Sequence, residues 1–234
     1  MSATLDADAA VSALASAIGE PTRARILVSL LDGRARTATE LAAVAEVGPS
    51  TISAHMRRLG TARLVAVRRQ GKNRYYSLSS AEVASLLERL SVFSAGKSSA
   101  SVCRAPEHLR AARTCYDHLA GNIGVALRDR FATLGWMTIA SSGGDETYAL
   151  TPSGVSSFLS LGIDVEAARG LRRRFAFGCL DWTERRYHIG GALGAALLQF
   201  AHRKRWVRQD LDSRALDVTV LGRRELLARF GVTL

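Results

Sequence analysis

Apolar residues recur at helical spacing near the start of the chain. Residues 20–22 (Glu-Pro-Thr) start a first helix, because proline in the first turn has no N–H that would need a partner. The positions that follow repeat at intervals of three and four residues, which indicates one buried helix face. This apolar face consists of Ile26, Leu27, Leu30 and Leu31.

A second, short helix is predicted over residues 39–45, and residues 47–49 (Val-Gly-Pro) form a turn before a third helix. In the third helix Ile52, Met56 and Leu59 lie at i, i+4 and i+7, so they point into the core. The opposite face is small, hydroxylated and cationic, which suits close approach to base edges and phosphates. It consists of Ser50, Thr51, Ser53, Ala54, Arg57 and Arg58.

Alternating apolar residues then predict a β-hairpin. Val65 and Val67 lie on its first strand, residues 70–73 (Gln-Gly-Lys-Asn) form its turn, and Tyr76 and Leu78 lie on its second strand. Positions 57 to 74 hold seven basic residues and no acidic one, which favours a polyanionic partner over a merely solvated surface. The residues predicted to contact DNA are Ser50, Thr51, Ser53, His55, Arg57, Arg58, Arg68, Arg69, Lys72 and Arg74.

These segments resemble the ArsR/SmtB family of bacterial winged-helix transcriptional regulators. The resemblance covers roughly residues 10–95 and rests on Glu-Pro-Thr-Arg, Thr-Glu-Leu-Ala, Ser-Thr-Ile-Ser-Ala-His and Arg-Tyr-Tyr in this order. It implies a homodimer that binds a palindromic operator, usually represses, and is released when an effector binds. It also implies that the helices around residues 5–18 and 80–93 make the dimer contact.

The two metal sites familiar in that family are missing from this sequence. Metal-sensing members often carry Cys-x-Cys on the helix before the turn, whereas residues 40–45 contain no cysteine. Other members use Asp and His on the helix after the wing. Residues 80–93 contain neither His nor Cys, and their only acids are Glu82 and Glu88.

Length and composition indicate a second globular domain. The 234 residues exceed one winged helix by more than a hundred, and 47% apolar with 23% charged residues is typical of a folded chain. The net charge is +11, and both parts of the chain contribute to it. The basic runs at residues 172–174 and 203–205 are interpreted either as contacts to the DNA backbone or as solvated surface.

Targeting signals and disulfides are not expected. Residues 1–19 have no basic residue to start a signal peptide, and the longest apolar stretch, residues 189–201, is too short and glycine-rich to span a membrane. Three cysteines in a chain of this size do not make a disulfide framework. We therefore expect a cytoplasmic protein.

The region beyond residue 113 contains an internal repeat. Residues 118–127 (HLAGNIGVAL) match residues 188–197 (HIGGALGAAL), and each is followed by a Trp, a turn, a strand and a short helix. Paired glycines in both copies, Gly121 with Gly124 and Gly191 with Gly194, indicate either close backbone packing or a face for a cofactor or effector.

Cysteine and histidine recur with the repeat and supply its candidate chemistry. Cys115 and His118 are predicted three residues apart at a helix start, and Glu184 and His188 are predicted at i, i+4 on one helix face. Thiolate and imidazole would suit zinc(II) or a similar ion. A redox-sensing thiol and a structural role are the alternatives. The candidate effector or metal residues are Cys115, Asp117, His118, Cys179, Asp181, Glu184 and His188, with Cys103 and His108 as further potential ligands.

The sequence thus predicts a mainly α protein with small β-hairpins (α+β). An N-terminal winged helix-turn-helix (residues 1–95) precedes a linker and lead-in helix (96–113) and two helix-hairpin-helix modules (114–165 and 166–234). The expected function is an effector-released, dimeric, operator-binding repressor, not an enzyme; the effector and any metal cofactor are undefined. Two alternatives stay open: an architectural DNA-binding protein without an effector, and an enzyme with a Cys nucleophile and a His base on the repeat, which lacks an oxyanion loop.

Overall fold

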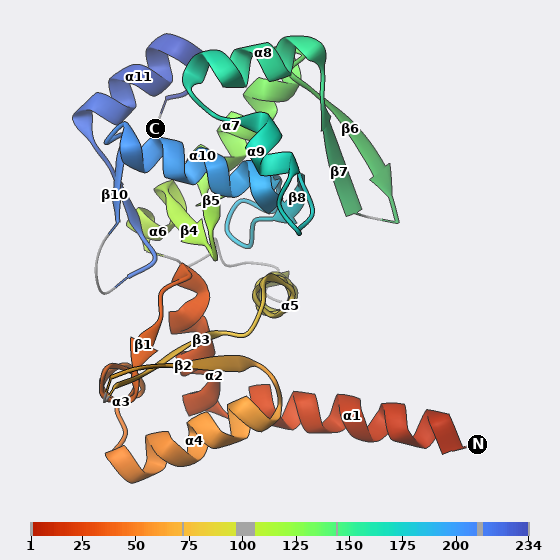
Figure 1. Ribbon diagram of the computed structural model, residues 1–234, viewed down its shortest axis with the longest axis vertical. Coiled ribbons are helices and arrows are strands. Elements are labelled where there is room, and N and C mark those ends of the chain that lie inside the picture. Colours follow the sequence, from red (N-terminus) through yellow and green to blue (C-terminus); the bar gives the residue numbers. More distant parts are fainter. Residues whose placement is uncertain (1, 72, 97–105, 144, 210–212, 234) are drawn as a thin grey trace. The chain divides into compact units, whose positions relative to one another are not determined.

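The computed structural model describes residues 2–71, 73–96, 106–143, 145–209 and 213–233 (Figure 1). Contacts within the chain divide it into two compact units, Met1–Leu87 and Glu88–Leu234. The small polar linker expected over residues 95–101 lies largely outside the described residues. The finer boundaries drawn from the sequence stay predictions. No helix in the described part of the chain is long and apolar enough to cross a membrane.

The first unit is a winged helix-turn-helix, as the sequence predicts. Its antiparallel sheet has the strand order β1-β3-β2, with β2 and β3 forming the wing (Figure 1). Its elements are α1 (Ser2–Ile18), α2 (Pro21–Ser29), a 3-10 turn (Leu30–Asp32), β1 (Arg36–Thr37), α3 (Ala38–Ala45), α4 (Pro49–Thr61), β2 (Val65–Gln70), β3 (Asn73–Leu78) and the start of α5 (Ala81–Gly96), which crosses the boundary between the units.

Side-chain caps determine where the helices of the first unit begin. The Glu20 carboxylate accepts hydrogen bonds from the Thr22 and Arg23 backbone N–H groups at 3.0 and 2.9 Å, so it satisfies donors that α2 cannot. Thr37 and Glu40 form a reciprocal capping box at the start of α3. The predicted inward residues of α4, Ile52, Met56 and Leu59, are buried.

The second unit contains both repeats. Each has the predicted helix-hairpin-helix order, and each is preceded by a further β-hairpin that the sequence did not reveal. After α6 (Glu107–Ala111), the first repeat consists of β4 (Arg113–Cys115), β5 (His118–Ala120), α7 (Asn122–Thr133), β6 (Met137–Ser142), β7 (Asp145–Leu150) and α8 (Pro152–Leu161). After α9 (Val165–Arg169), the second consists of β8 (Phe177–Leu180), β9 (Tyr187–Gly190), α10 (Gly191–Arg203), β10 (Val207–Gln209), β11 (Leu216–Val218) and α11 (Val220–Phe230).

The two repeats are interlocked, because each leading hairpin joins the other repeat's second hairpin. β8–β9 continues the β6–β7 hairpin into one four-stranded sheet through the pair Thr147↔Phe177. In the same way, a bridge pairs Arg113 at the start of β4 with Ala215 next to β11. The helices follow the same exchange, since α7 packs on β9 and α10 packs on β5 (Figure 1).

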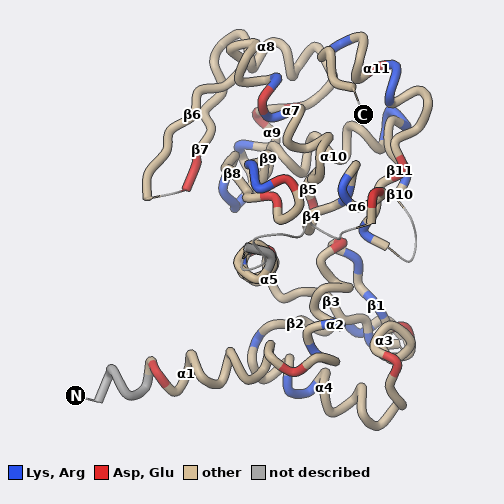
Figure 2. Tube along the Cα trace, turned by 180° about the vertical axis from the view of Figure 1, so that it is seen from behind, with Lys and Arg blue, Asp and Glu red and all other residues tan. Residues whose placement is uncertain are grey.

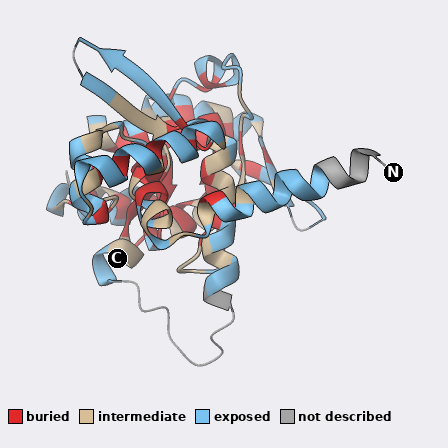
Figure 3. Cartoon of the chain, turned by 90° about the horizontal axis from the view of Figure 1, so that it is seen from below, coloured by how far each residue is buried: buried red, intermediate tan, exposed pale blue. Residues whose placement is uncertain are grey.

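One hydrophobic core serves both repeats. The ring of Phe131, on α7, lies 5.1 Å from that of Phe158 in its own repeat and 5.4 Å from that of Phe230 in the other. Around this core α10 is buried along most of its length, and α7 is buried at five of its twelve residues. In the first unit, α1 is exposed along most of its described length (Figure 3). The repeats are therefore halves of one folding unit.

Close backbone approach explains the paired glycines. A Cβ on Gly124 would lie 2.5 Å from the Leu119 carbonyl oxygen and 3.3 Å from the His188 Cβ. The equivalent Cβ on Gly194 would lie 2.1 Å from the Ile189 carbonyl oxygen and 2.9 Å from the His118 Cβ. Close packing, one of the two interpretations offered above, is thus confirmed, and the neighbouring repeat fills the glycine face.

Gly154→Ala should destabilise the second unit by about 2–4 kcal/mol, because the new Cβ would lie 1.9 Å from the Trp136 carbonyl oxygen and force the backbone apart. Gly170→Ala is the matched control, since its Cβ meets nothing closer than 3.6 Å. Denaturant unfolding followed by tryptophan fluorescence measures both, because Trp136, Trp182 and Trp206 all lie in the second unit. Equal stability of the two variants would contradict the close approach.

Candidate nucleic-acid interface and a buried cysteine–histidine cluster

The outward face of α4 presents short polar side chains and a cation to solvent. Ser50, Thr51, Ser53 and Arg57 are exposed, as predicted from the helical spacing. The Ser53 hydroxyl donates to the Pro49 carbonyl at 2.8 Å, which leaves its oxygen free to accept. This surface offers hydroxyl groups and a guanidinium without bulky apolar side chains between them, which is what groove contact needs.

Two other predicted DNA contacts on α4 also interact within the first unit. The His55 imidazole is only 15% exposed and its Nδ1 lies 3.6 Å from the Glu20 carboxylate, at the cap of α2. The Arg58 guanidinium donates to the Ser16 hydroxyl at 3.0 Å. These contacts orient α4 against α1 and α2, and the DNA role of His55 and Arg58 stays a prediction.

The wing carries like charges directly opposite each other. In the β2–β3 ladder Arg69 pairs with Arg74, and Arg68 pairs with Tyr75. Like charges on facing strand positions repel, and none of these three arginines forms an ion pair with another described residue. Figure 2 marks the basic positions of α4 and β2. Such a strand pair is stabilised when an anion such as phosphate lies between the cations. Lys72, at the turn, lies outside the described residues.

The equivalent hairpin in the first C-terminal repeat has no such charge. Strands β6 and β7 contain no lysine or arginine, and Asp145 and Glu146 begin the second of them. The helix that precedes this hairpin, α7, is buried at five of its twelve residues. The first repeat therefore lacks the cationic hairpin that suits DNA and that the first unit has.

The cysteines and histidines of the repeats lie on strands, so the predicted helical placement is wrong. Cys115 and His118 are cross-strand partners in the β4–β5 hairpin, and Cys179 and His188 are partners in β8–β9. Gly121, with φ of +79°, separates the first hairpin from α7, which begins only at Asn122. In the second copy, Gly191 adopts the same backbone with φ of +82°.

Glu184 does not share a helix face with His188 either. It lies in the loop between β8 and β9, where its backbone N–H donates to the Asp181 carboxylate at 3.2 Å. The Asp181 carboxylate stabilises this loop, because it also accepts a hydrogen bond from the Thr183 N–H at 2.9 Å. Glu184 thus helps to form the loop and stands outside the cluster of cysteines and histidines.

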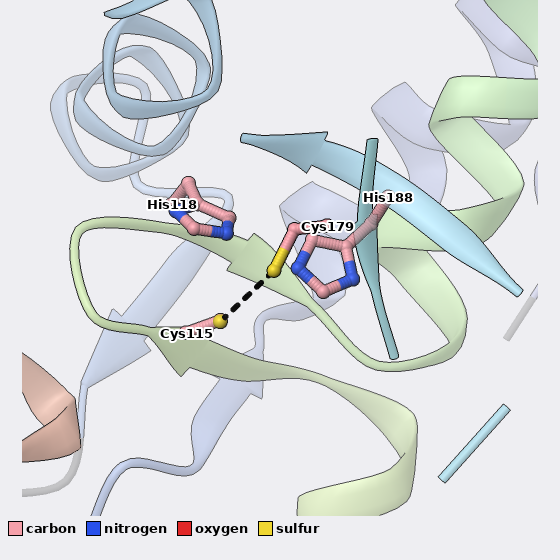
Figure 4. Close-up of side chains that lie close together, drawn as sticks. All are labelled: Cys115, His118, Cys179 and His188. Carbon is pink, nitrogen blue, oxygen red and sulfur yellow. Dashed lines mark hydrogen bonds between the residues drawn. The ribbon is translucent and has the colours of Figure 1, made fainter. Parts of the chain in front are cut away.

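Four of the predicted ligands meet in one buried cluster: Cys115, His118, Cys179 and His188 (Figure 4). One ligand atom from each lies within 4.8 Å of all the others, and the two sulfur atoms are 3.7 Å apart. All four side chains are buried, and the two imidazole rings are 5.1 Å apart, centroid to centroid. Each repeat contributes one sulfur and one imidazole, so the cluster lies where the two leading hairpins meet.

A carboxylate stands behind each imidazole. The Nδ1 atoms of His118 and His188 lie 3.3 Å from the carboxylates of Asp117 and Asp181 respectively. The Nε2 atoms of both rings are buried and have no hydrogen-bond partner among the described residues. Asp117 and Asp181, predicted as direct ligands, therefore lie one step further out. Asp117 hydrogen-bonds the His118 ring, and Asp181 lies beside the His188 ring, whose Nδ1 has no hydrogen-bond partner among the described residues.

Arginines keep these carboxylates ionised. Burial opposes ionisation of Asp117, but hydrogen bonds from His118 and Arg173 hold the pKa of its carboxyl at about 2. Asp181 is also buried, and His188 and Arg113 lower its pKa still further. The Arg113 guanidinium donates to Asp181 at 2.7 Å, and both side chains are fully buried. The run at residues 172–174 is thus partly internal, because Arg173 pairs with Asp117.

The same surroundings raise the pKa of the Cys115 thiol and of both imidazoles. The hydrogen bond to Cys179 and burial raise the pKa of the Cys115 thiol well above 9. Burial lowers the pKa of His118, but Cys115 and Asp117 more than offset this and raise it to about 10. The pKa of His188 is raised too, since Asp181 and Cys115 outweigh burial. Basic imidazoles backed by carboxylates are good electron-pair donors.

Several residues of this site could not be found from the sequence. Arg113, Arg173 and Thr183 hold the carboxylates, and the Gly121 N–H donates to Asp181 at 2.7 Å across the repeats. Arg113 and Thr183 lie two residues from Cys115 and from Asp181 in the sequence, whereas no sequence signal pointed to Arg173. His108 lies exposed on α6, and Cys103 falls outside the described residues.

Comparison with known proteins gives similarity over the whole chain and over its first part. A family model described as bacterial regulatory protein, arsR family, matches residues 20–67. The uncharacterised HTH-type transcriptional regulator YdfF of Bacillus subtilis (strain 168) is 37% identical over 215 residues, which cover 91% of this chain and 93% of YdfF.

Two solved structures are similar to about two fifths of the chain. NolR from Sinorhizobium fredii is 30% identical over 38% of this chain and 89% of its own, with a TM-score of 0.36. The homodimeric winged helix-turn-helix DNA-binding domain of Mb0332 from Mycobacterium bovis is 29% identical over 40% of this chain and 82% of its own, also with a TM-score of 0.36.

Asp181→Asn should destabilise the second unit by about 3–5 kcal/mol, because it leaves the buried Arg113 guanidinium without a counter-charge. Asp217→Asn is the control: its partner Arg208 and Asp217 itself are exposed, so the change should cost less than about 0.5 kcal/mol. Urea unfolding in the presence of a chelator, followed by tryptophan fluorescence, compares the two. A small loss for Asp181→Asn would mean that water or another group replaces the carboxylate.

Proposed function

Because the chain belongs to the arsR family of bacterial regulatory proteins, and is thus a DNA-binding transcription regulator, we propose that it is a dimeric, effector-released repressor. In this proposal α4 reads a palindromic operator and the β2–β3 wing holds the neighbouring phosphates. The observation that supports it most strongly is the facing pair Arg69 and Arg74, which forms no ion pair within the described part of the chain. We further propose that the protein acts in the cytoplasm, where its DNA target lies.

Dimer formation is proposed from the apolar surface of two helices. On α1, Val11 is 68% exposed; on α5, Leu90 and Phe93 are 42% and 66% exposed. Each helix thus exposes apolar surface in a single protomer, and burying that surface against a second copy is favourable. A dimer also brings two recognition helices to half-sites about one helical turn apart, which gives more specificity than one helix can.

The second unit is proposed to receive the effector. The helix positions where metal-sensing relatives carry ligands, residues 40–45 and 80–93, hold no cysteine or histidine here.

The alternative function is that of an architectural DNA-binding protein, which would bind DNA without regard to sequence and would need no effector. Competition between operator and random DNA at equal salt distinguishes the two, since only a regulator discriminates strongly.

Arg69→Ala should weaken binding to operator and random DNA alike, and should reduce the slope of log affinity against log salt by about one. The reason is that the wing arginine neutralises a phosphate rather than reading a base. Arg223→Ala removes an exposed cation from α11 instead and should leave the slope unchanged. Fluorescence anisotropy at several salt concentrations gives these slopes. A changed operator preference at constant slope would show that Arg69 reads bases.

Phe93→Glu and Val11→Glu should each shift the protein from dimer to monomer, because a charge replaces an apolar contact. Val220→Glu serves as the control: Val220 is 87% exposed on α11, outside the two helices proposed to form the dimer contact, and its replacement should leave the dimer intact. Sedimentation velocity at micromolar concentration measures the mass. A monomeric wild-type protein, with and without operator DNA, would refute the dimer.

A further inference from the structure

The cysteine–histidine cluster has the donor set of a tetrahedral metal site. Two sulfur and two nitrogen donors converge, with all four ligand atoms within 4.8 Å of one another (Figure 4). Zinc bonds of about 2.3 Å to sulfur and 2.0 Å to nitrogen place ligand atoms about 3.3–3.8 Å apart. The Sγ–Sγ distance of 3.7 Å already fits this geometry. The remaining edges, which involve nitrogen, need to close by no more than about 1.5 Å.

The Nε2 atoms of the two imidazoles lack a binding partner within the described part of the chain. Both Nε2 atoms are buried without a hydrogen-bond partner, a costly arrangement in a protein interior. The Nδ1 of His118 hydrogen-bonds the Asp117 carboxylate at 3.3 Å, which orients this ring and leaves its Nε2 available to bind an ion. The Nδ1 of His188 lies 3.3 Å from the Asp181 carboxylate, and both nitrogens of this ring are without a hydrogen-bond partner among the described residues. Carboxylate–histidine pairs of this kind are the usual outer support of metal-binding imidazoles.

We propose that Cys115 and Cys179, through Sγ, and His118 and His188, through Nε2, bind one divalent metal ion of the zinc class. Two thiolates neutralise the charge of a divalent ion. The carboxylates behind the rings are neutralised in turn by Arg113 and Arg173, so the filled site has no net charge. A hard ion such as magnesium or calcium prefers oxygen donors and is not favoured by this set.

The ion would join the two repeats. Cys115 and His118 come from β4–β5, and Cys179 and His188 come from β8–β9, so binding links hairpins that are about seventy residues apart in the sequence. Four protein donors leave no open position for a substrate, which is typical of a site that stabilises structure. This inference concerns the second unit alone and does not depend on the proposed mode of operator binding.

The test is cobalt(II) titration of the full-length protein after its own metal has been removed under reducing conditions. The expected result is one cobalt per chain, intense visible absorption typical of four-coordinate cobalt, and near-ultraviolet sulfur-to-cobalt bands that correspond to two thiolates. Zinc should displace the cobalt and abolish both absorptions. A melting temperature that rises on adding zinc to the metal-free wild type gives a second readout that needs no variant.

Variants identify the ligands. Cys115→Ser and Cys179→Ser should each halve the sulfur-to-cobalt absorption, and His118→Asn and His188→Asn should each weaken cobalt binding at least tenfold. His108→Asn, the same change on exposed α6, should bind cobalt like the wild type. Circular dichroism of each metal-free variant establishes that it is folded, and operator binding is measured separately, so that loss of metal and loss of DNA binding are told apart.

Three outcomes would overturn the assignment. The first is wild-type protein that gives only the weak spectrum of six-coordinate cobalt. The second is full sulfur-to-cobalt absorption in the Cys115→Ser/Cys179→Ser double variant. The third is a Cys115–Cys179 disulfide in protein kept under a reducing buffer, which would make the sulfur pair a redox element instead. Unchanged thermal stability on adding zinc would also count against an ion that joins the repeats.

Discussion

The second unit depends on the hydrogen bonds and the ion pair that the buried carboxylate of Asp181 makes. This carboxylate lies in the loop of the second repeat, yet it accepts from the Arg113 guanidinium and the Gly121 N–H of the first repeat, both at 2.7 Å. Its remaining capacity goes to its own loop and to His188. A buried charge is tolerated only when it is paired and hydrogen-bonded, so the loop, the first hairpin and the start of α7 must be in place together.

This requirement accounts for the interlocked repeats. Within one repeat alone, the partners that Asp181 has in the other repeat, Arg113 and Gly121, would be absent. Exchange of the leading hairpins brings α7 onto β9 and α10 onto β5, and Gly124 and Gly194 allow the backbones to approach there. The same exchange carries one cysteine and one histidine from each repeat to a shared centre. Folding of the unit and assembly of the cluster are consequently a single event.

The first unit could be predicted from sequence almost completely, and the second only in part. In the first, local signals agree with the fold: Pro21 and Glu20 begin α2, Thr37 and Glu40 cap α3, and alternation marks the wing. In the second, the repeat and its helix-hairpin-helix order were visible. The leading hairpins were not, because β4 and β5 are three residues each and are held by pairing with distant chain rather than by their own pattern.

That difference explains the error about the candidate site. Spacings of three and four residues between cysteine, glutamate and histidine suggest one helix face, but they are equally compatible with a tight hairpin or a loop. Tyr116, with φ of +60°, lies in the turn that brings Cys115 opposite His118. Nothing in the sequence predicts that a tyrosine adopts this left-handed conformation. The choice of residues still proved informative, because one cysteine and one histidine from each repeat meet in a single cluster.

Net charge alone is a poor guide to where this protein meets DNA. The chain carries +11, and the second unit holds most of its arginines, but many of these are bound to carboxylates within that unit (Figure 2). Such pairs are Arg113–Asp181, Arg128–Glu146, Arg173–Asp117 and Arg214–Glu88. Arg69 and Arg74 face each other on the wing without such a partner among the described residues. The number of cations does not indicate where a polyanion binds. Cations that repel each other and have no carboxylate partner within the fold indicate that surface better.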